Sequence, residues 1–469
     1  MRILAVSLGP IFPRDVHGGS QKVLRDLSIG LAKRGNRLTI LCTRRDDNHL
    51  PFELDEGVVV KPILPFKQVF PMPYAVPPHQ LARLCSIILD EIRVNDLLYL
   101  HDGGLNIEFL KNIIPTVVSL RDFTYPETLL GAFNFNESDL IVNSEHTYQS
   151  LLRTVATFKP DIIERTHIVF NGYDDMHFKP CSNIKRIKSY LNLVLNDDDR
   201  IISFPHRGES SKGVFEVLEI VKVLARTCTK FKLLMPRYID LNVSSDLAPL
   251  YDKVERYIRD HDLTSHVILH AWVPHHLMPE YYSLAHVTLC VGNFVEAFSN
   301  ATIESLLCGT PVVTSKAATY RSMPVMRFIQ SVDYQDYSSI IHLILRAFNG
   351  DFVNSVADAR AAIQKDMRLE VMVTQYETIF ARAVNKAPLP VRLPQQIINQ
   401  DTVFKLSPWC YVAGSKIYDD YISGYHATTT FNDLLVSHGG SLSLNDLQQA
   451  GFGMPDALEA LKLGVLVAQ

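Results

Sequence analysis

The stretch from residue 287 to residue 315 constrains the fold of this chain more than any other part of it. The run VTLCV is short, apolar and rich in β-branched residues, ATIESLLC has helical spacing, and Gly309 ends that helix before the run PVVTS. The stretch therefore predicts a strand, a loop, a helix and a second strand. Glu296 then follows the carboxyl end of a strand, and Glu304 lies on the next helix. Because ligands of open α/β sheets bind at this edge, the sequence predicts an α/β fold with a ligand site at these two glutamates.

Carboxylates at this place can hold a sugar. A carboxylate accepts two hydrogen bonds at once, so either glutamate can bind a diol such as the 2′ and 3′ hydroxyls of a ribose. Ser299 or Asn300 can cap the helix, which leaves its N-terminal N–H groups for an anion or a sugar hydroxyl. Taken alone, however, the pair fits two solvated surface glutamates equally well.

The wider context, EAFSNATIESLLCGTPVV, resembles the E-x7-E motif of the retaining GT-B glycosyltransferases of family 4, the glycosyl transferases group 1. Phe298, Gly309 and Pro311 match that motif together with the two glutamates, which favours the resemblance over a solvated pair. It implies an α/β GT-B fold, with two Rossmann-like domains facing a cleft. It also implies that Glu296 positions the donor sugar and Glu304 the ribose. Three neighbours would complete the donor contacts: Phe298, Ser299 and Asn300.

The N-terminal half opens as strand, long loop, helix and strand, which predicts a βαβ unit. The resemblance implies that Gly18 and Gly19, at the end of the long loop, let the backbone approach the donor phosphates, although a Gly-Gly pair is also common in ordinary turns. His101 ends the later strand DLLYL, where the family has a histidine that reaches the donor sugar or the reacting centre. A lone histidine is more often structural. Arg121 stands where the family usually has another histidine, which puts its acceptor-side features in doubt.

The second half begins with the strand IISF, followed by Arg207 and Lys212 before an amphipathic helix. The resemblance places these two cations on the donor diphosphate. Fixed cations at a helix N-terminus stabilise the charge that develops on a departing nucleoside diphosphate. The ordinary alternative is a pair of surface cations. Residues 271–273 are expected to face the nucleobase, and the adjacent His275 and His276 are interpreted as loop surface rather than metal ligands.

The order of these segments predicts four regions. Residues 1–175 form an acceptor-side Rossmann-like domain, which a returning helix at 366–385 completes, and residues 176–365 form the donor domain. A proline-rich linker spans residues 386–400. Residues 401–469 resemble a small winged-helix module. Its second helix, SLNDLQQAG, lacks the cations that a DNA reader needs, so docking of a protein or carrier, or dimerisation, is the better hypothesis.

Composition excludes several classes of protein. The net charge of −4 gives no basic field for nucleic acid, and the seven cysteines form no C-x-x-C pair. We therefore expect no metal, no cofactor and a cytoplasmic location. No apolar run approaches the length of a membrane span, which leaves only peripheral contact with a membrane open.

The predicted function is transfer of a hexose-type sugar from a UDP- or GDP-sugar to an acceptor hydroxyl, with retention and without a metal ion. His101, Arg207, Lys212 and Glu296 would carry the catalysis. Two alternatives remain. One is another GT-B enzyme, such as a nucleotide-sugar epimerase or a phosphorylase. The other is a non-catalytic docking subunit, which the departures from the family pattern favour; these departures are Arg121, Ala271, Ala297 and Ser299.

Overall fold

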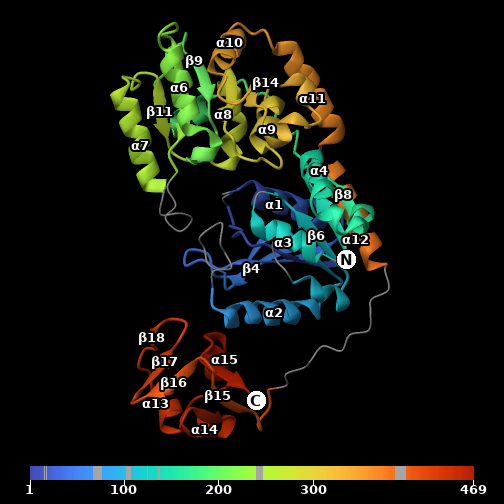
Figure 1. Ribbon diagram of the computed structural model, residues 1–469, viewed down its shortest axis with the longest axis vertical. Coiled ribbons are helices and arrows are strands. Elements are labelled where there is room, and N and C mark those ends of the chain that lie inside the picture. The colour runs from blue at the N-terminus through green and yellow to red at the C-terminus, as the bar shows by residue number, and fades with distance from the viewer. Residues whose placement is uncertain are drawn as a thin grey trace. The chain divides into compact units, whose positions relative to one another are not determined.

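The computed structural model describes residues 1–14, 16, 18–66, 76–101, 107–123, 125–135, 138–238, 247–385 and 398–469. It divides into two compact units: residues 1–73 with 91–389, and residues 74–90 with 390–469 (Figure 1). Most of the predicted linker, residues 386–397, lies outside the described residues. Among the described residues, no helix has both the length and the apolar composition needed to cross a membrane.

The first unit contains two α/β sheets. The first sheet has the strand order β3-β4-β2-β1-β5-β6-β7-β8, and all neighbours are parallel except β3 and β4. The central strands are buried along almost their whole length, which explains their near-continuous apolar sequences. The strands are β1 (Arg2–Val6), β2 (Arg37–Thr43), β3 (Phe52–Asp55), β4 (Val58–Leu64), β5 (Leu97–Leu100), β6 (Thr116–Leu120), β7 (Asp139–Val142) and β8 (Thr166–Ile168).

Among the described residues of this first half, the chain forms four α-helices. They are α1 (Gly19–Ala32), α2 (Pro78–Ile92), α3 (Pro126–Asn134) and α4 (Glu145–Arg153). Most of α2 falls within the second compact unit. α1 presents an apolar face to the core of the sheet, including Val23, Leu27 and Leu31. Ser144 caps α4 by accepting a hydrogen bond from the backbone N–H of Thr147 at 3.2 Å.

The second sheet is wholly parallel, with the order β11-β10-β9-β12-β13-β14. Its strands are β9 (Arg200–Ser203), β10 (Phe231–Pro236), β11 (Val267–His270), β12 (Val287–Cys290), β13 (Val312–Ser315) and β14 (Gln330–Val332). The helices of this half are α5 (Lys185–Tyr190), α6 (Val214–Leu224), α7 (Leu247–Asp260), α8 (Met278–Leu284), α9 (Asn300–Leu307), α10 (Tyr337–Phe348) and α11 (Val353–Asp366). Two Rossmann-like sheets are therefore present, as the sequence predicted.

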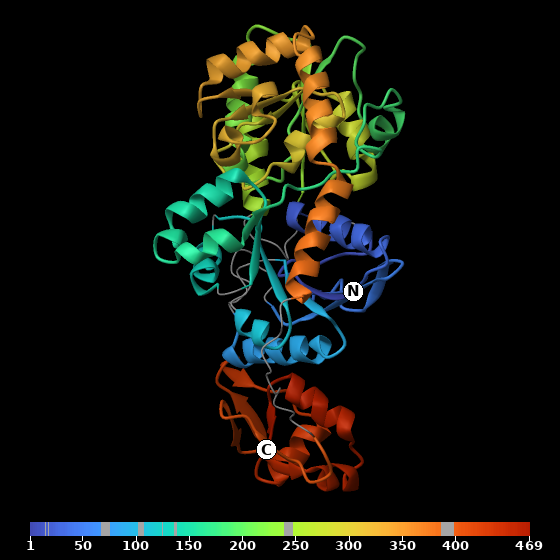
Figure 2. The ribbon, with the colours of Figure 1, turned by 90° about the vertical axis from the view of Figure 1, so that its right-hand side faces the viewer.

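A last helix, α12 (Leu369–Val384), returns to the first sheet (Figure 2). Its buried side chains, among them Tyr376 and Phe380, join the core that the first sheet forms with α1. The two crossings of the chain between the halves meet at Tyr173. Its N–H donates to the carbonyl of Met367 and its carbonyl accepts from the N–H of Leu369, both at 2.9 Å. The predicted domain limits at residues 175 and 365 stay a prediction.

The described residues of the second unit form two small antiparallel sheets, β19-β15-β20 and β16-β17-β18. The second helix that the sequence predicted for this module, SLNDLQQAG, is present at Leu444–Gln449. A winged-helix classification of this module stays a prediction. The elements are β15 (Val403–Leu406), β16 (Cys410–Ala413), β17 (Lys416–Asp419), β18 (Gly424–Tyr425), α13 (Thr430–Ser437), β19 (Ser441–Ser443), α14 (Leu444–Gln449), α15 (Met454–Lys462) and β20 (Leu466–Ala468).

Candidate functional site

A cavity of about 240 Å³ lies in the first unit, between the N-terminus of α1 and the carboxyl ends of β9 and β12. All of the site residues predicted from the sequence line it except His101. Those that line it are Gly18, Gly19, Arg207, Lys212, Glu296, Phe298, Ser299, Asn300 and Glu304. Parallel strands place their carboxyl ends at one edge of a sheet, which explains why residues so far apart in sequence meet there.

The loop between β12 and α9 carries the first glutamate and the start of the helix. Ser299 occupies the N-cap position of α9, but its side chain makes no capping bond; it accepts a hydrogen bond from the hydroxyl of Tyr320 at 2.8 Å. The Asn300 side chain accepts from the hydroxyl of Tyr173 at 2.6 Å and from the amide of Asn171 at 3.0 Å. The expectation that one of these two side chains caps the helix is therefore wrong. Ser299 bonds the hydroxyls of Tyr320 and Thr302 rather than a backbone N–H, and Asn300 bonds Tyr173 and Asn171.

The two predicted cations face the cavity while paired with carboxylates. Lys212 Nζ lies 2.5 Å from Glu296 Oε1 and 3.7 Å from the centre of the Phe294 ring. Arg207 pairs with Glu209 at 2.9 Å. About one third of the Arg207 side chain is exposed, so its guanidinium can reach a ligand without a change in the fold.

Two glycines hold the loop of Lys212 against β12. Gly213, which directly precedes α6, has a φ of +93°. Glycine adopts this left-handed backbone conformation without strain. Gly292 packs against the same loop: a Cβ on it would lie 2.3 Å from the carbonyl oxygen of Ser211 and 2.3 Å from the carbonyl carbon of Lys212. The position of the Lys212 ammonium therefore depends on the absence of a side chain at residue 292.

Glu304 is buried beside a lysine that the sequence did not single out. Lys22, on α1, is 5% exposed; its ammonium lies 2.8 Å from Asp26 and 3.8 Å from Glu304 Oε1. The hydroxyl of Tyr282 donates to Glu304 Oε2 at 3.1 Å. Burial raises the pKa of Glu304 to about 7, although Lys22 and Tyr282 both act to lower it. Burial lowers the pKa of Lys22, but the charges of Asp26 and Glu304 outweigh it, so the net pKa is raised.

The raised pKa of Glu304 predicts a pH-dependent stability. Below the unfolded pKa of 4.5 the carboxyl is protonated in both states, and its contribution to stability is fully present; that contribution is lost as the pH rises through about 7. The loss over this window is of order 3 kcal/mol, since each pKa unit corresponds to about 1.4 kcal/mol. Between pH 4.5 and about pH 7, we expect the unfolding free energy of Glu304→Gln, measured in urea, to change less with pH than that of the unchanged chain. Glu56→Gln, at an exposed glutamate, is the matched control, and equal slopes in all three proteins would contradict the assignment.

His101 lies at the end of β5, fully buried, and does not line the cavity. Its Nε2 is 2.9 Å from Ser20 Oγ, and its Nδ1 is 2.9 Å from the hydroxyl of Tyr99. Through Ser20 the ring contacts the first turn of α1, next to Gly19, which does line the cavity. A direct catalytic role for His101 stays a prediction, and its observed contacts are those of a residue that positions α1. The nearby Arg121 donates to Asn171 Oδ1 at 2.5 Å.

One side of the cavity is lined by residues between 272 and 275, of which the sequence reasoning missed only His275. Trp272 and Val273 line the cavity within the stretch expected to face a nucleobase. His275, interpreted from the sequence as loop surface, lines it as well and stacks on His177 with ring centres 4.9 Å apart. Burial, aided by the charge of Lys22, lowers the pKa of His275 to about 4, so the ring is neutral at pH 7. That expectation is wrong for His275, whereas His276 is exposed.

Comparisons with known proteins agree with this geometry. Residues 186–332 match the sequence model of the family Glycosyl transferases group 1. YtcC of Bacillus subtilis (strain 168), provisionally named a glycosyltransferase, is 22% identical over 246 residues, which cover 49% of this chain and 58% of YtcC. The chain thus spans little more than half the length of that relative.

Solved structures cover more of the chain. Sucrose-phosphate synthase from Thermosynechococcus elongatus superposes with a TM-score of 0.66 at 18% identity, covering 81% of this chain and 98% of the other. A glycosyltransferase from Rickettsia africae gives 0.65 at 14% identity, covering 82% and 99%. Anabaena HepE in complex with UDP and glucose gives 0.61 at 17% identity, covering 81% and 99%. The chain therefore has a GT-B-like α/β fold and carries a glycosyl transferases group 1 domain at residues 186–332.

Proposed function

We propose that this protein transfers a sugar from a nucleotide-sugar donor to an acceptor hydroxyl. The observation that carries the proposal is the meeting of two cations and two carboxylates around one cavity, at the strand edge where α/β sheets bind ligands. The HepE structures, which hold UDP, UDP-glucose, or UDP with glucose, support a donor of this chemistry. The sugar and the acceptor are left open, as is a cytoplasmic location, which stays a prediction.

The cations would bind the diphosphate. Lys212 is held by Glu296, and Arg207 by Glu209, so both charges are already fixed at the cavity before a ligand enters. A diphosphate offers each cation a more highly charged partner, and its charge grows as the bond to the sugar breaks. In this proposal these side chains replace a divalent metal ion, and the reaction needs none.

The carboxylates would bind the sugars of the donor. Once Lys212 binds the diphosphate, Glu296 is released toward the transferred sugar, whereas Glu304 accepts from the ribose hydroxyls. We propose that the reaction retains the anomeric configuration, with the departing phosphate taking the proton of the acceptor hydroxyl. No side chain then has to act as a nucleophile.

Nucleotide binding is the first test. UDP or GDP should raise the melting temperature of the full chain by a few degrees. Ligand at about a hundred times its Kd stabilises the folded state by about 2.7 kcal/mol. AMP is the control for unspecific anion effects. If no nucleoside diphosphate or nucleotide sugar raises the melting temperature more than AMP does, the proposal fails.

Turnover is the second test, and it separates the enzyme from a docking subunit. A bound UDP- or GDP-sugar should be hydrolysed slowly in the absence of an acceptor, and without added Mg²⁺. Proton NMR of the first sugar released should show the anomer of the donor. Binding without any turnover would favour the non-catalytic alternative, and a changed sugar still attached to its nucleotide would favour an epimerase.

A further inference from the structure

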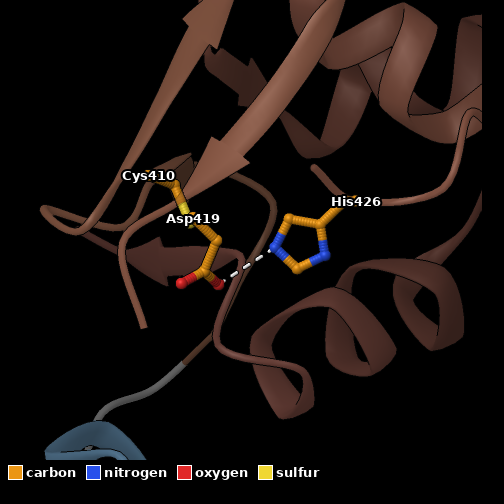
Figure 3. Close-up of side chains that lie close together, drawn as sticks. All are labelled: Cys410, Asp419 and His426. Atoms are coloured by element: carbon orange, nitrogen blue, oxygen red, sulfur yellow. Dashed lines mark hydrogen bonds and ion pairs between the residues drawn. The ribbon is translucent and has the colours of Figure 1, made fainter. Parts of the chain in front are cut away.

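The small sheet β16-β17-β18 of the second unit brings together a thiol, a carboxylate and an imidazole. Cys410 begins β16, Asp419 ends β17, and His426 follows β18 directly. One ligand atom from each side chain lies within 4.8 Å of the other two. Figure 3 shows the imidazole of His426 facing the carboxylate of Asp419. Among the described residues, these three form the group whose residue types and spacing suit a metal ion.

Strand pairing fixes these positions. Cys410 and Asp419 are direct partners across the β16–β17 pair, and directly opposed residues of antiparallel strands point to the same face of a sheet. Asp419 also pairs with Gly424 of β18. The backbone N–H of His426 donates to the carbonyl of Ile417 at 2.9 Å, which ties the histidine to the middle strand. Three ligands on three neighbouring segments are therefore held without help from a long loop.

The environment of Asp419 favours a cation. This carboxylate is 2% exposed, and the Cys410 thiol beside it is also buried. Asp419 Oδ1 accepts from the N–H of Tyr421 at 2.8 Å, and Oδ2 lies 3.0 Å from His426 Nε2. Among the described residues, its ion-pair partner is this histidine rather than a lysine or an arginine. A buried carboxylate is costly unless a positive charge or hydrogen bonds compensate it, and a divalent cation would do so fully.

We propose that Cys410, Asp419 and His426 bind a zinc ion that stabilises the second unit. A sulfur, a nitrogen and an oxygen ligand suit Zn²⁺, whereas Mg²⁺ and Ca²⁺ prefer oxygen ligands alone. Zinc–ligand bonds of about 2.0–2.3 Å place tetrahedral ligand atoms roughly 3.3–3.7 Å apart, which side-chain rotation reaches from the present spacing. The His426 side chain is 18% exposed, so water can take the fourth position.

Binding exchanges a proton for the metal. The thiol gives its proton to solvent and becomes a thiolate ligand. The proton that His426 Nε2 donates to Asp419 moves through solvent to Nδ1, and Nε2 then binds the ion in place of its bond to Asp419. The ion then links β16, β17 and the segment after β18, in the manner of a structural zinc site that contributes to folding. The site uses none of the residues that line the cavity of the first unit, so the proposal is independent of the proposed function.

Cobalt substitution of the full chain tests the site. After removal of metal with a chelator, Co²⁺ should bind at about one ion per chain, with a thiolate-to-cobalt charge-transfer band and the strong visible bands of tetrahedral Co²⁺. Zn²⁺ should displace it and raise the melting temperature of the second unit. Cys410→Ser should abolish the charge-transfer band, and His426→Gln should weaken binding at least tenfold, about the smallest loss expected even for outer-shell changes.

Matched controls complete the experiment. Cys228→Ser removes a partly exposed cysteine of the first unit, and His438→Gln removes an exposed histidine of the same module; both should bind Co²⁺ as the unchanged chain does. If Cys410→Ser does not fold, His426→Gln carries the test, because that side chain is partly exposed. A charge-transfer band that is absent from the unchanged chain, or that survives in Cys410→Ser, would overturn the proposal.

Discussion

Replacing Lys212 by alanine should lower kcat/KM for the donor by about 10²–10³-fold, the loss seen when a fixed group that stabilises transition-state charge is removed. The ammonium lies at the cavity between Glu296 and the Phe294 ring, and only 17% of the side chain is exposed. Water can therefore replace it only poorly. Arg207→Ala should cause a loss of the same order. Steady-state kinetics with a proven donor measure both.

The control for Lys212 is a lysine that makes the same kind of pair outside the site. Lys230 pairs with Asp198 on the surface, and 70% of its side chain is exposed. Lys230→Ala should leave kcat/KM unchanged. Equal activity in Lys212→Ala and Lys230→Ala would refute the role given to Lys212.

A double variant separates charge stabilisation from positioning. If Lys212 acts only by holding Glu296, then adding Lys212→Ala to Glu296→Gln should cost nothing further. If its charge acts on the diphosphate, the double variant should be slower than Glu296→Gln alone. We expect the second result.

Placing a methyl group at residue 292 should disable the site without changing any charge. In Gly292→Ala the new Cβ would lie 2.3 Å from Ser211 O and 2.6 Å from Lys212 O, which are backbone atoms and cannot rotate away. The loop must move, and Lys212 moves with it. A displacement of about 1 Å at a catalytic group can cost about 10²-fold in rate. We expect such a loss, together with about 1–3 kcal/mol of stability from overpacking.

Gly424→Ala is the matched control for this change. The nearest atom to a Cβ there is 3.6 Å away, and the backbone is not in the left-handed region. Urea unfolding and donor kinetics should therefore show little change. Full activity in a folded Gly292→Ala protein would mean that the loop tolerates displacement, and that the position of Lys212 does not matter.

The sequence predicted those site residues whose positions depend only on their neighbours along the chain. Glu296 and Glu304 follow from one strand, one loop and one helix whose periodicity can be read directly, and Phe298 follows from the resemblance of this segment to the family motif. Arg207 and Lys212 likewise follow from a strand end and a helix start. In each case the chain direction alone determines which edge of the sheet the side chain reaches.

Residues that depend on distant partners could not be predicted in the same way. The sequence shows that Lys22 can pair with Asp26 one helical turn away, but not that it approaches Glu304 across the cavity. Ser299 is a residue type that often caps a helix at this position, yet its hydroxyl accepts a hydrogen bond from the hydroxyl of Tyr320. The group of Cys410, Asp419 and His426 was missed for the same reason, because its spacing becomes visible only through the register of β16 and β17.

The junction at Tyr173 ties the two halves of the first unit together. Both chain crossings pass this point and are hydrogen-bonded to each other, and a Cβ on Gly172 would lie 2.8 Å from the Cα of Leu369, so the two segments are in close contact. A rotation of one half relative to the other would therefore have to turn about Tyr173 to keep both of these backbone hydrogen bonds.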